Sequence, residues 1–195
     1  MSRKNTIAAL VLLGLTAWFW ACERHASPPV LHLEDLDSRV VDPLKEGEAE
    51  VRVFVFARTD CPISNRYAPE IRRIADRFDD QGIEFWMVYP DPDEEIPAIR
   101  GHLDEFSLDL AALRDVRHDL VRWTEATSTP EVAVIVSGRG VVYHGAIDDR
   151  YVNFGQARQE PQHRYLEEVL SAVVEGREVE WQSTKSIGCT IRSLL

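Results

Sequence analysis

The stretch around Cys61 joins an apolar strand pattern to the start of a helix. Val51 to Phe56 is rich in β-branched and aromatic residues, which is typical of a buried strand. Asp60 and Pro62 are a capping residue and a first-turn proline, so we expect a helix that begins at Cys61. The unpaired N–H groups and the positive dipole of such a helix end favour a thiolate, which makes Cys61 a candidate nucleophile. The alternative is that Cys61 is a small buried core residue.

Strand and helix patterns alternate along most of the remaining chain. The expected strands are residues 83–89, 108–115, 131–136 and 141–147, and the expected helices are residues 61–79, 94–106, 118–126 and 163–175. The first two of these strands alternate with helices, which predicts parallel pairing. The turn Ser137–Gly140 predicts instead that the last two strands form an antiparallel hairpin. A small entry hairpin is expected at Leu31–Val41, and Asp93 is a candidate cap for the helix at 94–106.

Three motifs resemble those of the thioredoxin superfamily. Cys61-Pro62-Ile63-Ser64 lies where that superfamily has its CxxC motif, with Ser64 in place of the second cysteine. Pro69 follows at the interval of the superfamily's helix proline. Thr129-Pro130 precedes an apolar run, as the superfamily's cis-proline does. The stretch Thr59–Asn65, TDCPISN, is similar more narrowly to bacterial redoxins.

The resemblance covers residues 31 to 176 and implies an α/β, thioredoxin-like fold. Such a fold has a central mixed sheet, helices on both faces and a C-terminal β-hairpin plus helix. It also implies that Pro130 faces the substrate beside Cys61. Because the strands of an antiparallel hairpin start and end at the same point, the loop after the second strand is expected near the thiol. The predicted substrate-binding residues are therefore Arg58, Thr59, Ser64, Thr129, Pro130, Asp148, Asp149, Arg150 and Tyr151.

A hydroxyl at Ser64 cannot resolve a mixed disulfide, so a dithiol mechanism needs another cysteine. Cys189, in a Gly-containing tail, is the candidate resolving thiol for exchange with protein thiols or disulfides. Alternatively, Cys61 reduces peroxide through a sulfenic acid that condenses with Cys189. Peroxiredoxins place a threonine three residues before the cysteine, where this chain has Arg58. A static disulfide between Cys61 and Cys189 is the non-catalytic interpretation.

The first 22 residues have the layout of an export signal. Arg3 and Lys4 precede a mainly apolar run, Ile7 to Trp20, that ends at Ala21-Cys22. This segment resembles a lipobox in which Cys22 is lipidated, and an uncleaved membrane anchor is the alternative. Both place the protein at the membrane in the periplasm or cell envelope. The predicted units are an export segment (1–22), a linker (23–30), a redoxin domain (31–178) and a tail carrying Cys189 (179–195).

The formal net charge of −11 argues against nucleic acid as a partner. No Gly-rich phosphate loop follows a strand, so we expect no organic cofactor. Two other classes of protein stay open beside a thiol oxidoreductase. Cys61, Cys189 and His144 offer ligands for copper in a metallochaperone-type module. A redox-silent domain would instead bind a partner at the membrane surface.

Overall fold

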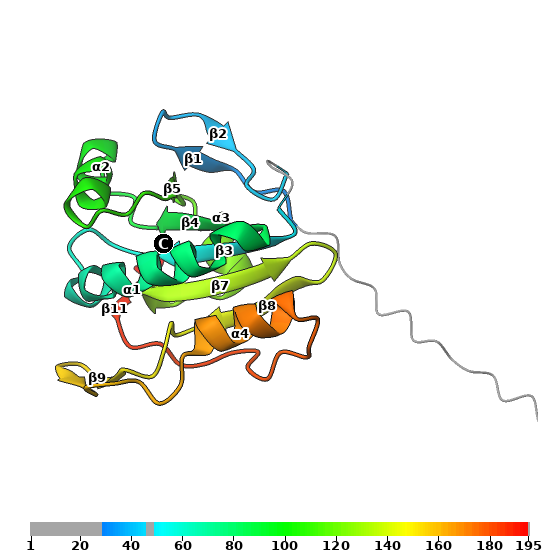
Figure 1. The fold of residues 1–195 in the computed structure, drawn as a ribbon. Coiled ribbons are helices and arrows are strands. Elements are labelled where there is room, and N and C mark those ends of the chain that lie inside the picture. The colour runs from blue at the N-terminus through cyan, green and yellow to red at the C-terminus, as the bar shows by residue number, and fades with distance from the viewer. Residues whose placement is uncertain (1–28, 46–48, 195) are drawn as a thin grey trace, which may run out of the picture.

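A seven-stranded sheet with helices on both faces forms the body of the protein (Figure 1). The computed structural model describes residues 29–45 and 49–194. The predicted export segment, with Cys22, and all but the end of the predicted linker lie outside the described residues. Within the described ranges, no helix combines the length and apolar character needed to cross a membrane.

The sheet is mixed and has the strand order β2-β1-β5-β4-β3-β7-β8. Its strands are β1 (Leu33–Asp35), β2 (Val40–Val41), β3 (Val51–Phe56), β4 (Ile83–Tyr89), β5 (Ala111–Arg114), β7 (Glu131–Val136) and β8 (Gly140–Gly145). β4 pairs parallel with β3 and β5, whereas β7 pairs antiparallel with β3 and β8. The crossover strands are thus parallel and the hairpin is antiparallel, as the sequence predicts.

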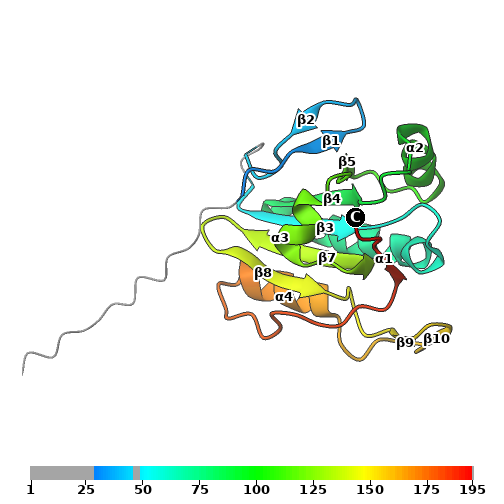
Figure 2. The ribbon, with the colours of Figure 1, turned by 180° about the vertical axis from the view of Figure 1, so that it is seen from behind.

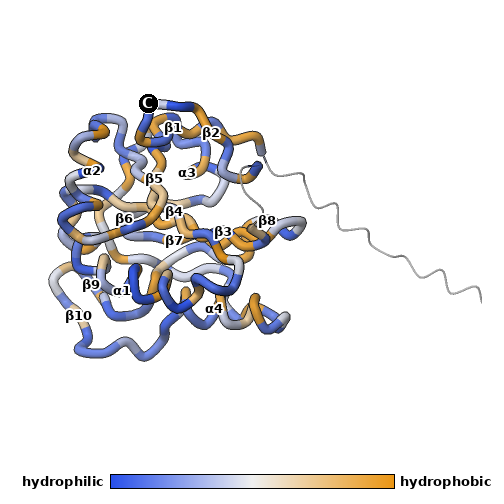
Figure 3. The backbone as a smooth tube through the Cα atoms, turned by 45° about the horizontal axis from the view of Figure 1, so that its top comes forward, coloured by the Kyte–Doolittle hydropathy of each residue, from blue (hydrophilic) through white to orange (hydrophobic). Residues whose placement is uncertain are grey.

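The sheet divides the core into two parts, and helices cover the part on each face. They are α1 (Pro62–Phe78), α2 (Ile96–Glu105), α3 (Asp119–Thr124) and α4 (Tyr165–Val174), with a 3-10 turn, η1 (Asp79–Gln81). Figures 1 and 2 show α1 and α4 on one face and α3 on the other. Val53 and Val55 of β3 pack with α1 and α4, whereas Phe54 and Phe56 pack with α3. Both faces of β3 are therefore buried, and Figure 3 shows the hydrophobic residues concentrated in the central strands.

Helix starts differ from the sequence prediction. Cys61 is the N-cap of α1, with extended backbone (φ −85°, ψ 109°), and Pro62 is the first helical residue. Asp60 does not cap the helix, because its carboxylate pairs with the Arg58 guanidinium at 3.0 Å. Likewise α2 begins at Ile96 after Glu95, so Asp93 does not cap it.

Two short strand pairs are absent from the sequence prediction. β9 (Tyr151–Asn153) and β10 (Gln156–Ala157) form an exposed hairpin after β8. β6 (Ser128–Thr129) pairs antiparallel with β11 (Cys189–Thr190) near the end of the chain. In Figure 2 the C-terminal segment leaves α4, runs below β8 and ends close to β3. The tail is therefore part of the folded body.

Candidate active site

Cys61 lies at the junction between the loop after β3 and the first turn of α1. Its residue surface is 0% exposed. The Sγ atom lies 3.1 Å from the backbone carbonyl oxygen of Thr129, to which the thiol donates. The Thr129–Pro130 peptide bond is cis, so this carbonyl belongs to the turn that the sequence assigns to the cis-proline. The structure thus brings Cys61, Thr129 and Pro130 together.

Cys189 reaches Cys61 from the other end of the chain. In the β6–β11 pair its register partner is Thr129, the same residue whose carbonyl oxygen accepts from Cys61. Each cysteine shifts the pKa of the other, and both are free thiols. Cys189 also packs against the part of the core that contains Cys61. The two sulfur atoms are therefore neighbours without being bonded.

The two thiols differ in acidity. Burial opposes ionisation of Cys61, but the neighbouring Cys189 and Ser64 outweigh it, so the pKa of Cys61 is lowered. Burial is the largest cause of the pKa shift of Cys189, and the neighbouring Cys61 adds to it. The pKa of Cys189 is thereby raised to about 12. Cys61 is therefore the more acidic thiol of the pair.

The loop before Cys61 is held by carboxylates. The Thr59 N–H donates to Glu94 Oε1 at 2.6 Å. Arg58 pairs with Asp60 and, at 3.4 Å, with Asp91. Arg58 and Thr59, both predicted to bind substrate, thus have their charge and backbone N–H directed at these carboxylates. Of that predicted set, Thr129 has a hydrogen bond with the Cys61 thiol among the described interactions, and Ser64 lies close enough to lower the pKa of Cys61.

The loop Asp148–Tyr151 contacts α1 at Tyr67. Tyr67 donates a short hydrogen bond to Asp148, and its ring packs at 5.5 Å from that of Tyr151. The Arg150 N–H donates to Asp148 at 2.9 Å. Together with Pro130, residues of this loop line a cavity of about 320 Å³. No hydrogen bond or ion pair of the described residues links this loop to Cys61.

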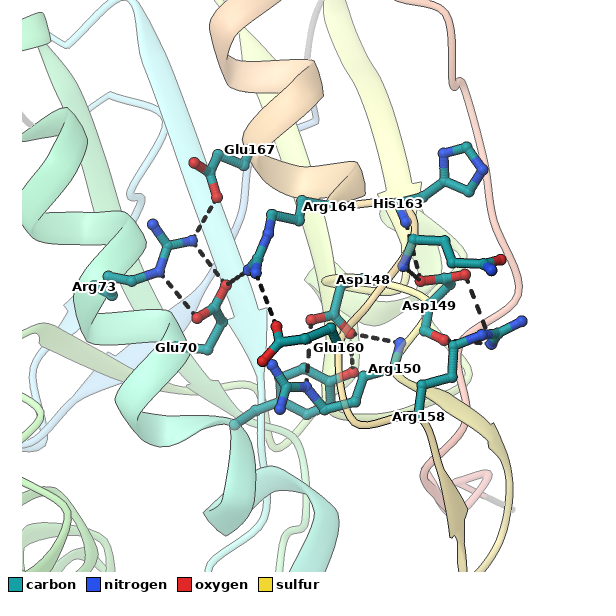
Figure 4. Close-up of polar contacts among 12 residues, drawn as sticks. Glu70, Arg73, Asp148, Asp149, Arg150, Arg158, Glu160, His163, Arg164 and Glu167 are labelled. Carbon is teal, nitrogen blue, oxygen red and sulfur yellow. Dashed lines mark hydrogen bonds and ion pairs between the residues drawn. The ribbon is translucent and has the colours of Figure 1, made fainter.

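Polar contacts fix the conformation of this loop. Asp149 accepts the backbone N–H groups of Gln162 and His163 at 2.7 and 3.0 Å, and Arg158 lies 3.6 Å from its carboxylate. Figure 4 shows Asp148 and Asp149 surrounded by arginine side chains and backbone donors. Burial is the main cause of the raised pKa of Asp148. The loop therefore shapes the cavity beside Pro130 rather than the electrostatics of the sulfur.

A hydrogen-bond chain behind the Cys61 loop was not predicted from the sequence. Asn65 Nδ2 donates to the Thr59 carbonyl at 3.2 Å, so Asn65 Oδ1 is left to accept from His102 Nε2 at 3.0 Å. His102 Nδ1 then accepts the Tyr89 hydroxyl at 2.9 Å. Burial lowers the pKa of His102, in accord with this neutral ring. Asn65 belongs to the TDCPISN motif, but no local signal pointed to Tyr89 or His102.

Among the described residues, His144 does not form a metal-binding group with Cys61 and Cys189. Its Nδ1 atom lies 3.8 Å from the carboxylate of Glu131. Among residues 29–45 and 49–194, no group of three or more His, Cys, Asp or Glu side chains is placed to hold a metal ion. A copper ion in this part of the chain would therefore have Cys61 and Cys189 as its ligands, without His144.

A cis-proline beside a helix-start cysteine, on a mixed sheet of this order, defines a thioredoxin-like fold, as the sequence predicts. Solved structures of other proteins share this fold. An uncharacterized conserved protein from Geobacillus kaustophilus matches with a TM-score of 0.73 and 22% identity, over 85% of this chain and 89% of that one. A hypothetical protein from Sinorhizobium meliloti matches with a TM-score of 0.71 and 20% identity, over 84% and 91% of the two chains.

A third similar structure has a described activity. It is a secreted disulfide oxidoreductase of Mycobacterium tuberculosis, homologous to E. coli DsbE, with a TM-score of 0.52 and 14% identity, over 75% of this chain and 96% of that one. At these identities the likeness establishes the fold alone. No protein-family model and no curated protein matches the chain, so the narrower redoxin type stays a prediction.

Proposed function

We propose that this protein is a thiol–disulfide oxidoreductase with Cys61 as the attacking thiol and Cys189 as the resolving thiol. One observation carries the proposal: Cys189 pairs in register with Thr129, whose carbonyl oxygen accepts from the Cys61 thiol, so two free thiols are neighbours at the cis-proline. Ser64 stands where a second cysteine of the motif would be, and Cys189 from the tail takes that place beside the sulfur. The described activity of the M. tuberculosis protein of the same fold supports the same chemistry.

The reaction proceeds in two exchanges. The Cys61 thiolate attacks one sulfur of a disulfide in a substrate polypeptide, the S–S bond breaks, and the other substrate sulfur leaves as a thiolate that takes a proton from water. Cys189 then loses its proton to water and attacks the Cys61 sulfur, which releases the second substrate thiolate. The substrate disulfide gains two electrons, and the Cys61–Cys189 dithiol becomes a disulfide. An external dithiol restores the enzyme by the reverse exchanges.

The same geometry gives less support to reduction of peroxide. A peroxidase needs a cation or hydroxyl donor at the thiolate to polarise the O–O bond. Arg58 is directed at Asp60 and Asp91, and the Thr59 N–H donates to Glu94. Polypeptide disulfides are therefore the substrates that the site favours. We also propose that the export segment predicted from residues 1–22 places this chemistry in the cell envelope.

Peptide mass spectrometry of the full chain tests the proposal, with a peptide that carries an internal disulfide as substrate. The reduced protein is expected to reduce the peptide stoichiometrically and to gain a Cys61–Cys189 disulfide. Cys189→Ser should accumulate a Cys61–peptide adduct, because the resolving thiol is missing, and Cys61→Ser should be inert. Exchange that persists in Cys61→Ser would refute the proposal. Thiols that do not exchange but that Cu(I) protects from alkylation would favour copper binding instead.

A further inference from the structure

The C-terminal segment covers the reactive thiol. We call residues 182–192 the strap. The strap runs antiparallel beside β6 at Cys189 and Thr190, and its Ile191 N–H donates to the Thr127 carbonyl at 2.9 Å. Upstream, the Thr184 N–H donates to the carbonyl of His144 in β8 at 3.2 Å. Cys61 beneath it is 0% exposed, so a polypeptide disulfide has no path to the sulfur while the strap is in place.

The fit of the strap against β6 depends on a glycine. A Cβ atom at Gly188 would lie 2.2 Å from the Thr129 carbonyl oxygen and 3.1 Å from the Pro130 nitrogen. Both are backbone atoms, so neither can move aside as the end of a side chain would. Any larger residue at this position therefore holds the strap away from the cis-proline turn.

An ion-pair cluster holds the end of the strap. Arg192 Nη2 lies 2.6 and 2.8 Å from the two carboxylate oxygens of Asp91 and 2.8 Å from Asp93 Oδ2. The carboxylate of Asp91 also lies 3.4 Å from Arg58, in the loop that carries Cys61. The Asp91 side chain is nearly buried, whereas the Arg192 side chain is 59% exposed. Water and salt ions therefore reach this ion pair from the side of Arg192.

We propose that the strap is a gate over Cys61, latched by Arg192 on Asp91 and Asp93, and that it occupies the edge of β6 along which a substrate segment would reach the thiol. This inference rests on the proposed function and adds the order in which the strap, the substrate and Cys189 reach the site. The strap leaves the edge of β6, the substrate disulfide reaches Cys61, and the strap returns with Cys189 to displace the substrate. One segment thereby excludes non-productive reactants and delivers the resolving thiol.

Alkylation of the reduced full chain with iodoacetamide, followed by peptide mass spectrometry, measures gating without any disulfide substrate. Arg192→Ala is expected to raise the rate at Cys61 by about fivefold, the population change that an exposed ion-pair network supports. Salt should raise the rate in the wild type, because screening weakens the latch, and should have little effect in Arg192→Ala. Arg177→Ala, which removes an exposed arginine paired with Glu175, is the matched control with unchanged rate.

A second pair of variants tests closure itself. Gly188→Ala is expected to expose Cys61 to alkylation and to slow formation of the Cys61–Cys189 disulfide during oxidation. Gly101→Ala is the control, because a Cβ atom at Gly101 in α2 would meet nothing within 4 Å. Alkylation rates at Cys61 that stay at the wild-type value in both Gly188→Ala and Arg192→Ala would overturn the gate.

The two proposals fail separately. If the alkylation rates are as expected but the protein never exchanges with the disulfide peptide, the gate is supported and the oxidoreductase function is refuted. If the protein exchanges through Cys61 but all variants are alkylated at the same rate, the function is supported and the gate is refuted.

Discussion

At Cys61, burial and hydrogen bonding act on the thiolate in opposite directions. A sulfur that is 0% exposed would ordinarily be held as the neutral thiol. The neighbouring Cys189 and Ser64 reverse that preference and lower the pKa. The buried Ser64 hydroxyl has no hydrogen-bond partner among the described residues, so it is available to donate to the sulfur once Cys61 ionises.

We predict that Ser64→Ala shifts the pH profile of Cys61 alkylation to higher pH. Removal of the Ser64 hydroxyl leaves Cys189 as the neighbour that favours ionisation, so the thiolate is less stabilised and the rate near neutral pH falls by about fivefold, the value of one hydrogen bond of about 1 kcal/mol. Ser171→Ala in α4 is the control. An unchanged profile in Ser64→Ala would show that the serine hydroxyl does not bind the thiolate.

At the scale of elements, Asn65 couples the start of α1 to α2 and β4. Its side chain accepts from His102 of α2 and donates to Thr59, while His102 accepts from Tyr89 at the end of β4. These groups are largely buried, so each needs its partner. The position of Cys61 against Thr129 therefore depends on side chains from three elements.

We predict that Asn65→Ala lowers the free energy of unfolding by about 1–3 kcal/mol, because it leaves His102 Nε2 and the Thr59 carbonyl unpaired. Urea unfolding followed by circular dichroism measures this loss. Asn153→Ala, on the exposed strand β9, should change stability by less than about 0.5 kcal/mol. Equal stability of the two variants would mean that water replaces the Asn65 side chain without cost.

The sequence predicted the elements that local patterns encode. β3 and β4 have the predicted bounds, because runs of β-branched and aromatic residues end at turn residues. The hairpin β9–β10 was missed, because its strands are short and mostly exposed, without an apolar alternation. The antiparallel pairing ends at Gly145 and the chain then turns toward Tyr67, so the contact of Asp148 with the Tyr67 hydroxyl could not be predicted from a local pattern.

At the scale of the whole molecule, the site is completed by contacts that no local pattern encodes. Arg192 and Asp91 are 101 positions apart, and Cys189 meets Cys61 through pairing with Thr129. Gly188 was visible as a residue of a tail, but its close approach to Thr129 follows only from the three-dimensional path. The two cysteines were predictable as a pair from their number, whereas the strap that joins them was not.

This arrangement ties the redox state of the pair to the stability of the whole chain. Cys61 and Cys189 are 128 positions apart, and closing a loop of that size by a disulfide stabilises a protein by about 4 to 5 kcal/mol in the chain-entropy model. The reduced protein has an opposing contribution from the Cys61 thiolate. Because its folded pKa is lowered from the ordinary value of 9.0, this contribution is fully present above pH 9 and is lost as pH falls through the folded pKa.

We therefore predict that the oxidised protein exceeds the reduced protein in stability by more at pH 6 than at pH 8.5. Other groups titrate in both forms and cancel in the difference, and Cys189, with a pKa of about 12, stays protonated in the folded protein over this range. Urea unfolding of both forms across the range measures the difference. Reduced Cys61→Ser, which lacks the titrating thiol, should lose this pH-dependent contribution relative to the reduced wild type. A difference between the oxidised and reduced forms that does not change with pH would mean that folding leaves Cys61 no more acidic than in the unfolded chain.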